Sequence, residues 1–322
     1  MLKSRITSMF LIFGLLMVNL FCCFVSAAKP KTLLKYAPYH DQVYYDKIQK
    51  KKYTREEIQI IENFLKETVN ESDFSVATHI ECINSIIDQN QIKSSVQIDW
   101  DSIKNSKYDK QRIDRRWATA EIFNVDISEL EASDYEKYGY LSCKDKRQDI
   151  EDGSDVPFYY GNVIMNLEKE NVLERTTLTI GDSLDNRWEL GERSITPTLA
   201  NNPRITCIPG HSRRLAKLIS QHIKSGSISP KHPNLIHKIK TKHLDFSYIE
   251  LQIHGELSFK KDVESIHIIK LNTEEEEENA RQAQLLQQAI EKIQKLGKPC
   301  YIVDCTDLNF NKIHKTTSLK KL

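Results

Sequence analysis

The sequence predicts an α+β protein: a helical N-terminal part followed by a mainly antiparallel β-rich domain with a C-terminal helix and strand. Three observations predict this class. Apolar residues recur at helical spacing after Thr54, apolar and polar residues alternate along several stretches after Phe158, and a capped helical pattern starts at Thr273. We expect a helical N-terminal region over residues 29–135 and a β-rich, candidate catalytic domain over residues 136–322.

The N-terminus has the pattern of an export signal. Two basic residues precede an apolar run over residues 9–25, and the small residues Ala27 and Ala28 follow it. The pattern predicts a signal peptide over residues 1–28 and a secreted or periplasmic protein. The alternative is an uncleaved membrane anchor, because the run approaches the roughly 18 residues that span a bilayer. Beyond this segment we expect no membrane association.

Composition excludes several classes of function. The chain of 322 residues has 46 basic and 45 acidic residues, a net charge of +1, so no nucleic-acid partner is expected. It contains neither GxGxxG nor GxxxxGK[ST], which argues against a Rossmann or P-loop nucleotide site.

The cysteines that remain after removal of the signal are widely spaced, and they are Cys82, Cys143, Cys207, Cys300 and Cys305. In an exported protein they can form up to two disulfides, with one thiol left over and the pairing open. No CxxC or His/Cys zinc pattern is present. We therefore expect no metal site.

Two helices are predicted in the N-terminal region. Thr54 and Glu57 form a capping box ahead of an apolar stripe, which is typical of a helix start. A second helix is expected after Asp73, with a stripe at Val76, Ile80, Ile83 and Ile87. Loose alternation over residues 92–101 suggests a short strand, and residues 126–137 are acidic and helix-compatible.

From Phe158 the pattern changes to strands. Residues 158–167 predict a strand with a bulge at Gly161, and residues 175–183 predict another that ends in a Gly-Asp-Ser turn. Residues 184–211 resemble a long loop excursion, and a basic helix follows over residues 213–224.

The strand predicted at residues 248–255 has the clearest alternation in the chain. Its apolar residues Ile249, Leu251 and Ile253 alternate with Tyr248, Glu250, Gln252 and His254. One face therefore belongs to the core. The other face is either a solvated surface or the floor of a site.

The C-terminal block predicts a strand, a helix and a last strand. The first strand covers residues 266–269. Thr273 caps a helix whose first turn holds five glutamates, and Gly297 ends it. Residues 301–303 form the last strand.

Several stretches between about residues 90 and 270 resemble, in the same order, a bacterial family that is labelled as a domain of unknown function. The most specific are RTTLTIGDS (residues 175–183) and YIELQIHG (residues 248–255). Shorter ones are KSSVQ, RWA with Phe123, KYG, FYYG and TPT. Lys93 stands where the family has an arginine.

A more distant similarity is to the ADP-ribosyltransferase superfamily. It implies that Arg175 or Lys93 binds a phosphate of NAD as co-substrate. It further implies a nicotinamide pocket shaped by Thr177, Thr179 or Ser183, and it makes Glu250 the catalytic residue.

Three classes of function stay open. The leading one is a secreted enzyme, toxin or effector of ADP-ribosyltransferase type, a glycosyltransferase that modifies a protein or a small acceptor. Another is a hydrolase or nuclease-like toxin with Glu250 and His254, flanking Gln252, as acid and base. The third is a non-catalytic binding or envelope protein, in which this polar face is simply exposed. The acceptor and the oligomeric state are left open.

Overall fold

The computed structural model describes residues 54–97, 130–154, 160–181, 198–201, 212–239, 248–270 and 276–308, with the single residues 116, 119, 123, 126, 128, 156 and 183. The predicted signal peptide, Cys207, Thr273 and nearly all of the predicted 184–211 excursion lie outside this part of the chain. Export, secretion and the removal of residues 1–28 therefore stay predictions.

The described strands form one eight-stranded sheet in the order β5-β4-β6-β2-β1-β3-β7-β8. Their bounds are β1 Asp73–Thr78, β2 Lys137–Ser142, β3 Val163–Leu167, β4 Thr176–Ile180, β5 Thr198–Leu199, β6 Ile249–Ile253, β7 Val263–Lys270 and β8 Cys300–Asp304. Neighbouring strands are antiparallel, except that β8 pairs with β7 in parallel. The α+β class and the mainly antiparallel sheet are confirmed.

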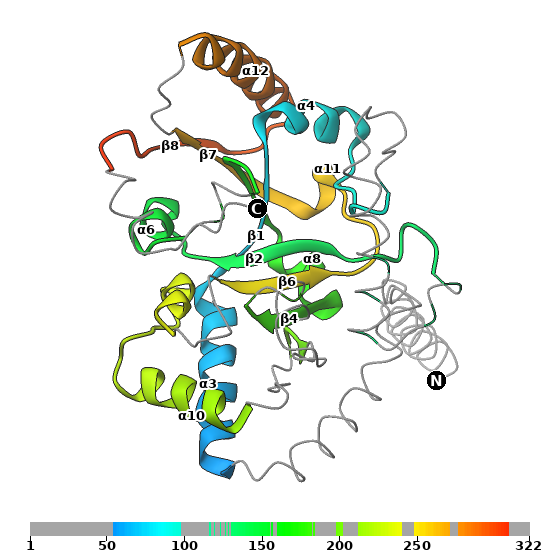
Figure 1. Cartoon of the computed structure of the whole chain (residues 1–322). Coiled ribbons are helices and arrows are strands. Elements are labelled where there is room, and N and C mark those ends of the chain that lie inside the picture. The colour runs from blue at the N-terminus through cyan, green and yellow to red at the C-terminus, as the bar shows by residue number, and fades with distance from the viewer. Residues whose placement is uncertain are drawn as a thin grey trace, which may run out of the picture.

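The helices lie in groups around the sheet (Figure 1). Their bounds are α3 Arg55–Glu71, α4 Ile80–Gln89, α6 Lys146–Glu151, α8 Lys169–Val172, α10 Ser212–Lys224, α11 Phe259–Asp262 and α12 Glu276–Lys295, with the 3-10 helices η4 Leu173–Arg175 and η5 Pro233–Lys238. Helix α3 packs on α10, and α12 packs on α4. The C-terminal helix and strand are confirmed, and α12 provides the crossover that the parallel β7–β8 pair requires.

Helix α3 begins where its capping box predicts. The Thr54 hydroxyl accepts a hydrogen bond from the Glu57 amide at 3.2 Å, and the Glu57 carboxylate accepts one from the Thr54 amide at 3.2 Å. The apolar stripe then buries Ile61, Phe64 and Leu65 in the main core.

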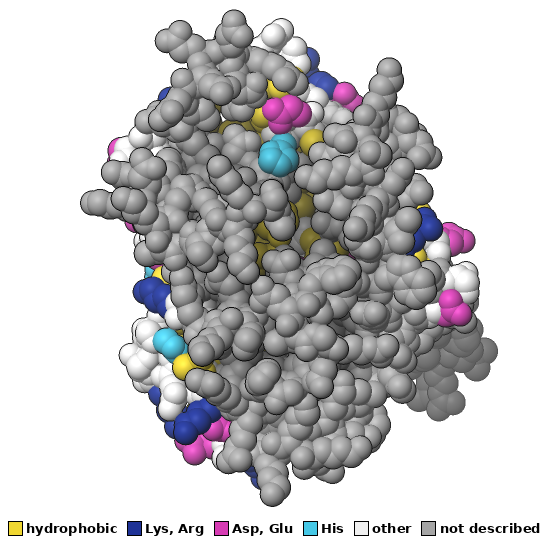
Figure 2. Space-filling view, in the orientation of Figure 1, with side chains coloured by type: hydrophobic (Ala, Val, Ile, Leu, Met, Phe, Trp, Pro, Cys, Tyr) yellow, Lys and Arg dark blue, Asp and Glu magenta, His cyan; other side chains and the backbone are white. Residues whose placement is uncertain are grey.

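Side chains alternate along each strand, so the sheet has two faces. One is apolar, and the other carries buried polar side chains together with a smaller apolar cluster that includes Ile164 and Ile269. On the apolar face, Leu178 of β4, Leu251 of β6 and Met165 of β3 join the core that the helices cover. In Figure 2, hydrophobic side chains are visible near the centre of the face, an acidic side chain and a histidine lie above them, and the Lys and Arg side chains lie toward the edges.

The expected helix after Asp73 is wrong over its first six residues. Asp73–Thr78 is strand β1, which lies between β2 and β3, and α4 starts only at Ile80, after His79 at its N-cap. Phe74 and Val76 face the apolar core, so a strand there satisfies backbone hydrogen bonds on both sides. This strand belongs to the same sheet as the strands that follow residue 136.

Two predicted strands also need correction. The described part of the 92–101 stretch, residues 92–97, contains a turn in which Gln97 N donates to Ser94 O at 3.0 Å. Within these six residues only Ile92 forms a bridge, with Leu257. Strand β3 begins at Val163, two residues after Gly161, so Gly161 is not a bulge inside it. Gly161 instead has φ +115 and lies against Thr78, whose carbonyl carbon would be 2.1 Å from an added Cβ.

The remaining differences are local. Strand β2 and helix α6 were not predicted, and residues 132–134 form a turn in the stretch expected to be helical. Of the predicted disulfide cysteines, Cys82, Cys143, Cys300 and Cys305 are free thiols. Within the described residues, no helix has the length and apolarity needed to cross a membrane.

Candidate functional site

The two most specific sequence motifs form neighbouring strands. Strand β4 carries Thr177 and Thr179, strand β6 carries Glu250 and Gln252, and the two strands pair antiparallel. Thr179 lies opposite Glu250 and Thr177 lies opposite Gln252. Directly opposed residues point to the same face with Cβ atoms about 5 Å apart, so these four side chains share one patch of the polar face.

This patch belongs to a row of polar residues that crosses six strands at one level. Each member lies directly opposite the next, and the row is Thr179 (β4), Glu250 (β6), Tyr140 (β2), Ser75 (β1), Asn166 (β3) and Ser265 (β7). All six residues are buried. The polar face is therefore an internal layer and differs from the solvated face expected of an exposed strand.

A chain of hydrogen bonds connects the side chains on β4 and β6. Thr177 Oγ1 donates to Gln252 Oε1 at 2.9 Å and lies 3.0 Å from His254 Nε2. Gln252 Nε2 donates to Thr179 Oγ1 at 2.9 Å and also to Glu250 Oε1. The Gln252 side chain is thus hydrogen-bonded to Thr177, Thr179 and the Glu250 carboxylate.

His254 is neutral within this chain of hydrogen bonds. Since the Thr177 hydroxyl proton is directed to Gln252, the contact with His254 assigns the Nε2–H tautomer, with the ring donating to Thr177. Burial, aided by the positive charges of Lys137 and Arg175, lowers the pKa of His254 to about 3. Phe123 packs edge-on against the ring, with centroids 5.0 Å apart.

Three buried polar atoms next to this chain of hydrogen bonds have no hydrogen-bond partner among the described residues. They are His254 Nδ1, Ser183 Oγ and Tyr140 Oη. Ser183 N lies 3.4 Å from Glu250 Oε2, and Tyr140 lies opposite Glu250 on β2. Buried polar atoms are nearly always satisfied by protein, water or ligand, so these three atoms retain the capacity to hydrogen-bond a further polar group.

Arg175 does not present its guanidinium to this patch. Its Nη1 donates to the carbonyl oxygens of His254 at 2.8 Å and Glu256 at 2.5 Å, its Nε donates to Asn171 O, and its Nη2 pairs with Asp262 at 3.3 Å. These contacts occupy most of the guanidinium fork. Arg175 therefore connects the start of β4 to the turn after β6.

Lys93, the other predicted phosphate ligand, is an exposed residue of the turn that follows α4. Its neighbour Ile92 bridges to Leu257, which follows β6 by four residues. No described contact joins Lys93 to the patch. The structure thus brings together Thr177, Thr179, Ser183, Glu250, Gln252 and His254, but neither predicted cation.

Sequence reasoning missed the contribution of β2. Tyr138 lies opposite Gln252, and its hydroxyl donates to Glu136 Oε1 at 2.6 Å, which also accepts from Thr119 at 2.7 Å. Lys137 is buried, and its Nζ donates to the carbonyl oxygens of Ser133, Tyr135 and Gly255. The period-two run from Tyr138 to Leu141 was a usable signal for this strand.

One group of described residues has metal-ligand geometry, and it lies outside β4 and β6. Cys143 follows β2, Asp152 ends α6 and His232 precedes η5, with one ligand atom from each within 4.8 Å of the others. The expectation of no metal came from the absence of short-range spacings. These residues are 9 and 80 positions apart in the chain, so spacing alone could not have revealed the group.

Comparison with known proteins adds no assignment. No family model matches the chain, and a search of curated proteins finds no match.

Proposed function

We propose that the Glu250 patch is the active site of an ADP-ribosyltransferase-type enzyme that uses NAD and modifies a protein or small acceptor. The observation that carries the proposal is the pairing of Thr179 with Glu250 on neighbouring strands. It matches the arrangement that the superfamily resemblance implies, with hydroxyl residues on one strand and a glutamate on another. The resemblance itself rests on the sequence motifs.

The chemistry of such a transfer suits a fixed carboxylate. The bond between the nicotinamide nitrogen and the ribose carbon breaks, nicotinamide leaves with the bonding electrons, and positive charge develops on the sugar. A nucleophilic atom of the acceptor then bonds to that carbon and loses its proton. Glu250, oriented by Gln252, would stabilise the developing charge, as preorganised groups do in water-poor sites.

The unsatisfied atoms near Glu250 fit a ligand with amide and hydroxyl groups. Ser183 Oγ can donate or accept, Tyr140 Oη can donate, and His254 Nδ1 can accept in its assigned tautomer. The carboxamide of nicotinamide and the ribose hydroxyls present complementary donors and acceptors. These atoms are the part of the proposed NAD site that the described residues support.

The phosphates of NAD need a cation, and Arg175 is already committed to protein partners. Arg116 is the better candidate because it is exposed, with its guanidinium carbon 5.9 Å from the centre of the Tyr135 ring. Thr119, one helical turn further on, reaches Glu136, which contacts Tyr138 opposite Gln252. We therefore assign Arg116 to the phosphates, and we expect Arg116→Ala to weaken NAD binding without loss of stability.

A non-catalytic binding or envelope protein is the second candidate. The observation that favours it is the commitment of Arg175 to the fold, which removes one phosphate ligand implied by the resemblance. The hydrolase reading has less support: a neutral His254 with a pKa of about 3 is poorly matched to acid–base work near neutral pH.

The test is transfer from NAD. The purified full-length chain is incubated with NAD labelled in its adenylate part and with a cell lysate, and both protein-bound label and released nicotinamide are measured. The proposal predicts nicotinamide release accompanied by label on an acceptor. Absence of release, together with absence of NAD binding by calorimetry, would support the non-catalytic candidate.

A further inference from the structure

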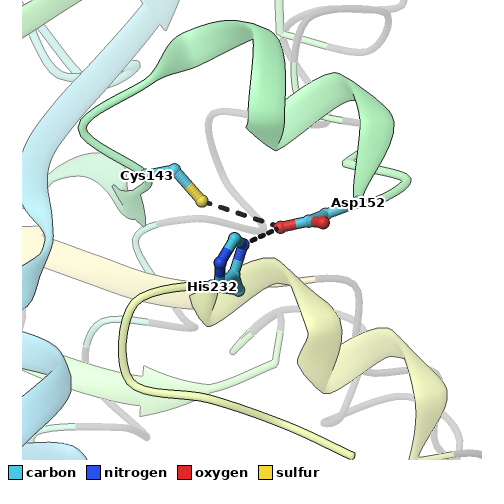
Figure 3. A group of neighbouring side chains, drawn as sticks. All are labelled: Cys143, Asp152 and His232. Carbon is cyan, nitrogen blue, oxygen red and sulfur yellow. Dashed lines mark hydrogen bonds and ion pairs between the residues drawn. The ribbon is translucent and has the colours of Figure 1, made fainter.

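Cys143, Asp152 and His232 bring three different metal-ligating atoms together from three separate elements. Figure 3 shows the thiol, the carboxylate and the imidazole directed toward one another. His232 Nδ1 lies 2.7 Å from Asp152 Oδ2, and Cys143 Sγ lies 3.8 Å from the same oxygen. The β4–β6 patch uses none of these residues.

Neighbouring side chains hold two of the ligands in place. Gln148 Nε2 donates to Asp152 Oδ1 at 2.8 Å, which leaves Oδ2 facing the thiol and the imidazole. Asp149 Oδ1 accepts from the Cys143 amide at 2.7 Å and from Asn234 Nδ2 at 2.6 Å. The second contact ties the Cys143 segment to η5, just after His232. Supporting hydrogen bonds of this kind are typical of metal sites, where they orient the ligands.

One of the three ligand-atom distances matches a tetrahedral zinc site, and all three lie within 4.8 Å. Ligand atoms bound to Zn²⁺ at about 2.0–2.3 Å lie about 3.3–3.8 Å from one another. The sulfur–oxygen distance of 3.8 Å already meets this spacing. The nitrogen–oxygen distance of 2.7 Å is that of a direct hydrogen bond, and it would lengthen when a metal ion replaces the shared proton.

We propose that Cys143, Asp152 and His232 bind a zinc ion with three protein ligands and one water. A thiolate, a carboxylate and a neutral imidazole carry a formal charge of −2, which Zn²⁺ neutralises, and the thiol proton leaves on binding. The thiol is buried, whereas the His232 side chain is 36% exposed, so the fourth position faces the solvent side.

This site would join the end of β2, helix α6 and η5 through a single ion. Because α6 has only six residues, it has little stability of its own and depends on tertiary contacts. Zinc binding should therefore stabilise the fold, and the open position leaves the ion accessible to a small anionic or thiol ligand.

Cobalt provides the direct test. The full-length chain, treated with a chelator and reduced, is titrated with Co²⁺ while absorption is recorded. The proposal predicts one equivalent of Co²⁺ bound, with a thiolate-to-cobalt charge-transfer band that Zn²⁺ abolishes by displacement. Cys143→Ser should remove the band, whereas the matched control Cys82→Ser, at an exposed cysteine, should keep it.

A second pair of variants keeps the test decisive if Cys143→Ser does not fold. His232→Gln changes a partly exposed residue and should weaken zinc affinity at least about tenfold, whereas His79→Gln, at another exposed histidine, should not. The melting temperature should rise with Zn²⁺ in the wild type and in His79→Gln, but not in His232→Gln. No saturable binding, or binding equal in His232→Gln and the wild type, would overturn the proposal.

Discussion

Thr179 lies directly opposite Glu250 in the β4–β6 pair, and Gln252 Nε2 donates to both side chains. Both residues are almost completely buried. A carboxylate in this setting is positioned by partners that are themselves held by the sheet, so its geometry depends on strand register. A shift of one residue would turn Glu250 into the apolar core.

Gln252 should be the residue whose loss most disturbs this arrangement. Gln252→Leu removes the partner of Thr177, Thr179 and Glu250 at once, and each buried polar group left unsatisfied costs about 1–3 kcal/mol. We expect the free energy of unfolding, measured by urea titration, to fall by about 3 kcal/mol or more. Gln288→Leu, on the exposed side of α12, should change it by less than about 0.5 kcal/mol. Equal effects would mean that the hydrogen-bond chain contributes nothing to stability.

Arg175 should behave as a structural residue. Arg175→Gln removes the cation that pairs with the nearly fully buried Asp262 carboxylate, which keeps the Ser258 amide, and it removes the donor to three backbone carbonyls. We therefore expect a loss of about 2–4 kcal/mol in unfolding free energy. Arg147→Gln removes exposed ion pairs with Glu151 and Asp307 and one hydrogen bond to the Asp304 carbonyl, and it should lower the free energy of unfolding much less than Arg175→Gln does. Loss of NAD binding at unchanged stability would instead make Arg175 a phosphate ligand.

His254 should make the protein less stable in acid. Its folded-state pKa is about 3 and the ordinary value is 6.5, so between these values the unfolded chain binds more protons than the folded chain. Its contribution is complete above pH 6.5 and is lost as the pH falls, by up to about 1.4 kcal/mol per pH unit.

The measurement compares unfolding free energy at about pH 4 and about pH 7. His254→Gln should show a smaller difference than the wild type, whereas His79→Gln, at an exposed position, should match the wild type. An unchanged pH dependence in His254→Gln would show that His254 is not held neutral in the fold.

Gly161 should tolerate no side chain. A Cβ there would lie 2.1 Å from the backbone of Thr78, and φ is +115. We expect Gly161→Ala to cost at least about 3 kcal/mol, since both the clash and the backbone conformation oppose it. Gly226→Ala is a matched control, with φ +70 and open space, and should cost only about 1–2 kcal/mol. Similar melting temperatures for the two variants would contradict the close packing.

The sequence predicted the elements whose signals are local. The capping box at Thr54 and the alternation around Leu251 correspond to α3 and β6, and the apolar spacing near Ile290 corresponds to α12. Strand β1 was mistaken for helix because Val76 and Ile80 are four residues apart, as on a helix face. Pairing with β2 and β3 on both sides decides its conformation, and these partners are distant in the chain.

The sequence predicts which residues share the candidate site, but it does not predict that the site is buried. Alternation identified Glu250, Gln252 and His254 as one face, and the structure places them beside Thr177 and Thr179. Burial of that face depends on what covers it, which no alternation pattern reveals. The phosphate-binding role expected of Arg175 rested on the resemblance to the ADP-ribosyltransferase superfamily, whereas its contacts are made to the turn after β6.

The most direct test of the central claim is the rate of nicotinamide release from NAD by Glu250→Gln. The amide keeps the size of the side chain and removes its charge. We expect release to fall by a factor on the order of 10²–10³, the usual effect of removing one electrostatic stabiliser, with folding intact by circular dichroism. The control Glu256→Gln, at an exposed position after β6, should release nicotinamide at the wild-type rate. Equal rates in Glu250→Gln and the wild type would contradict a catalytic role for Glu250.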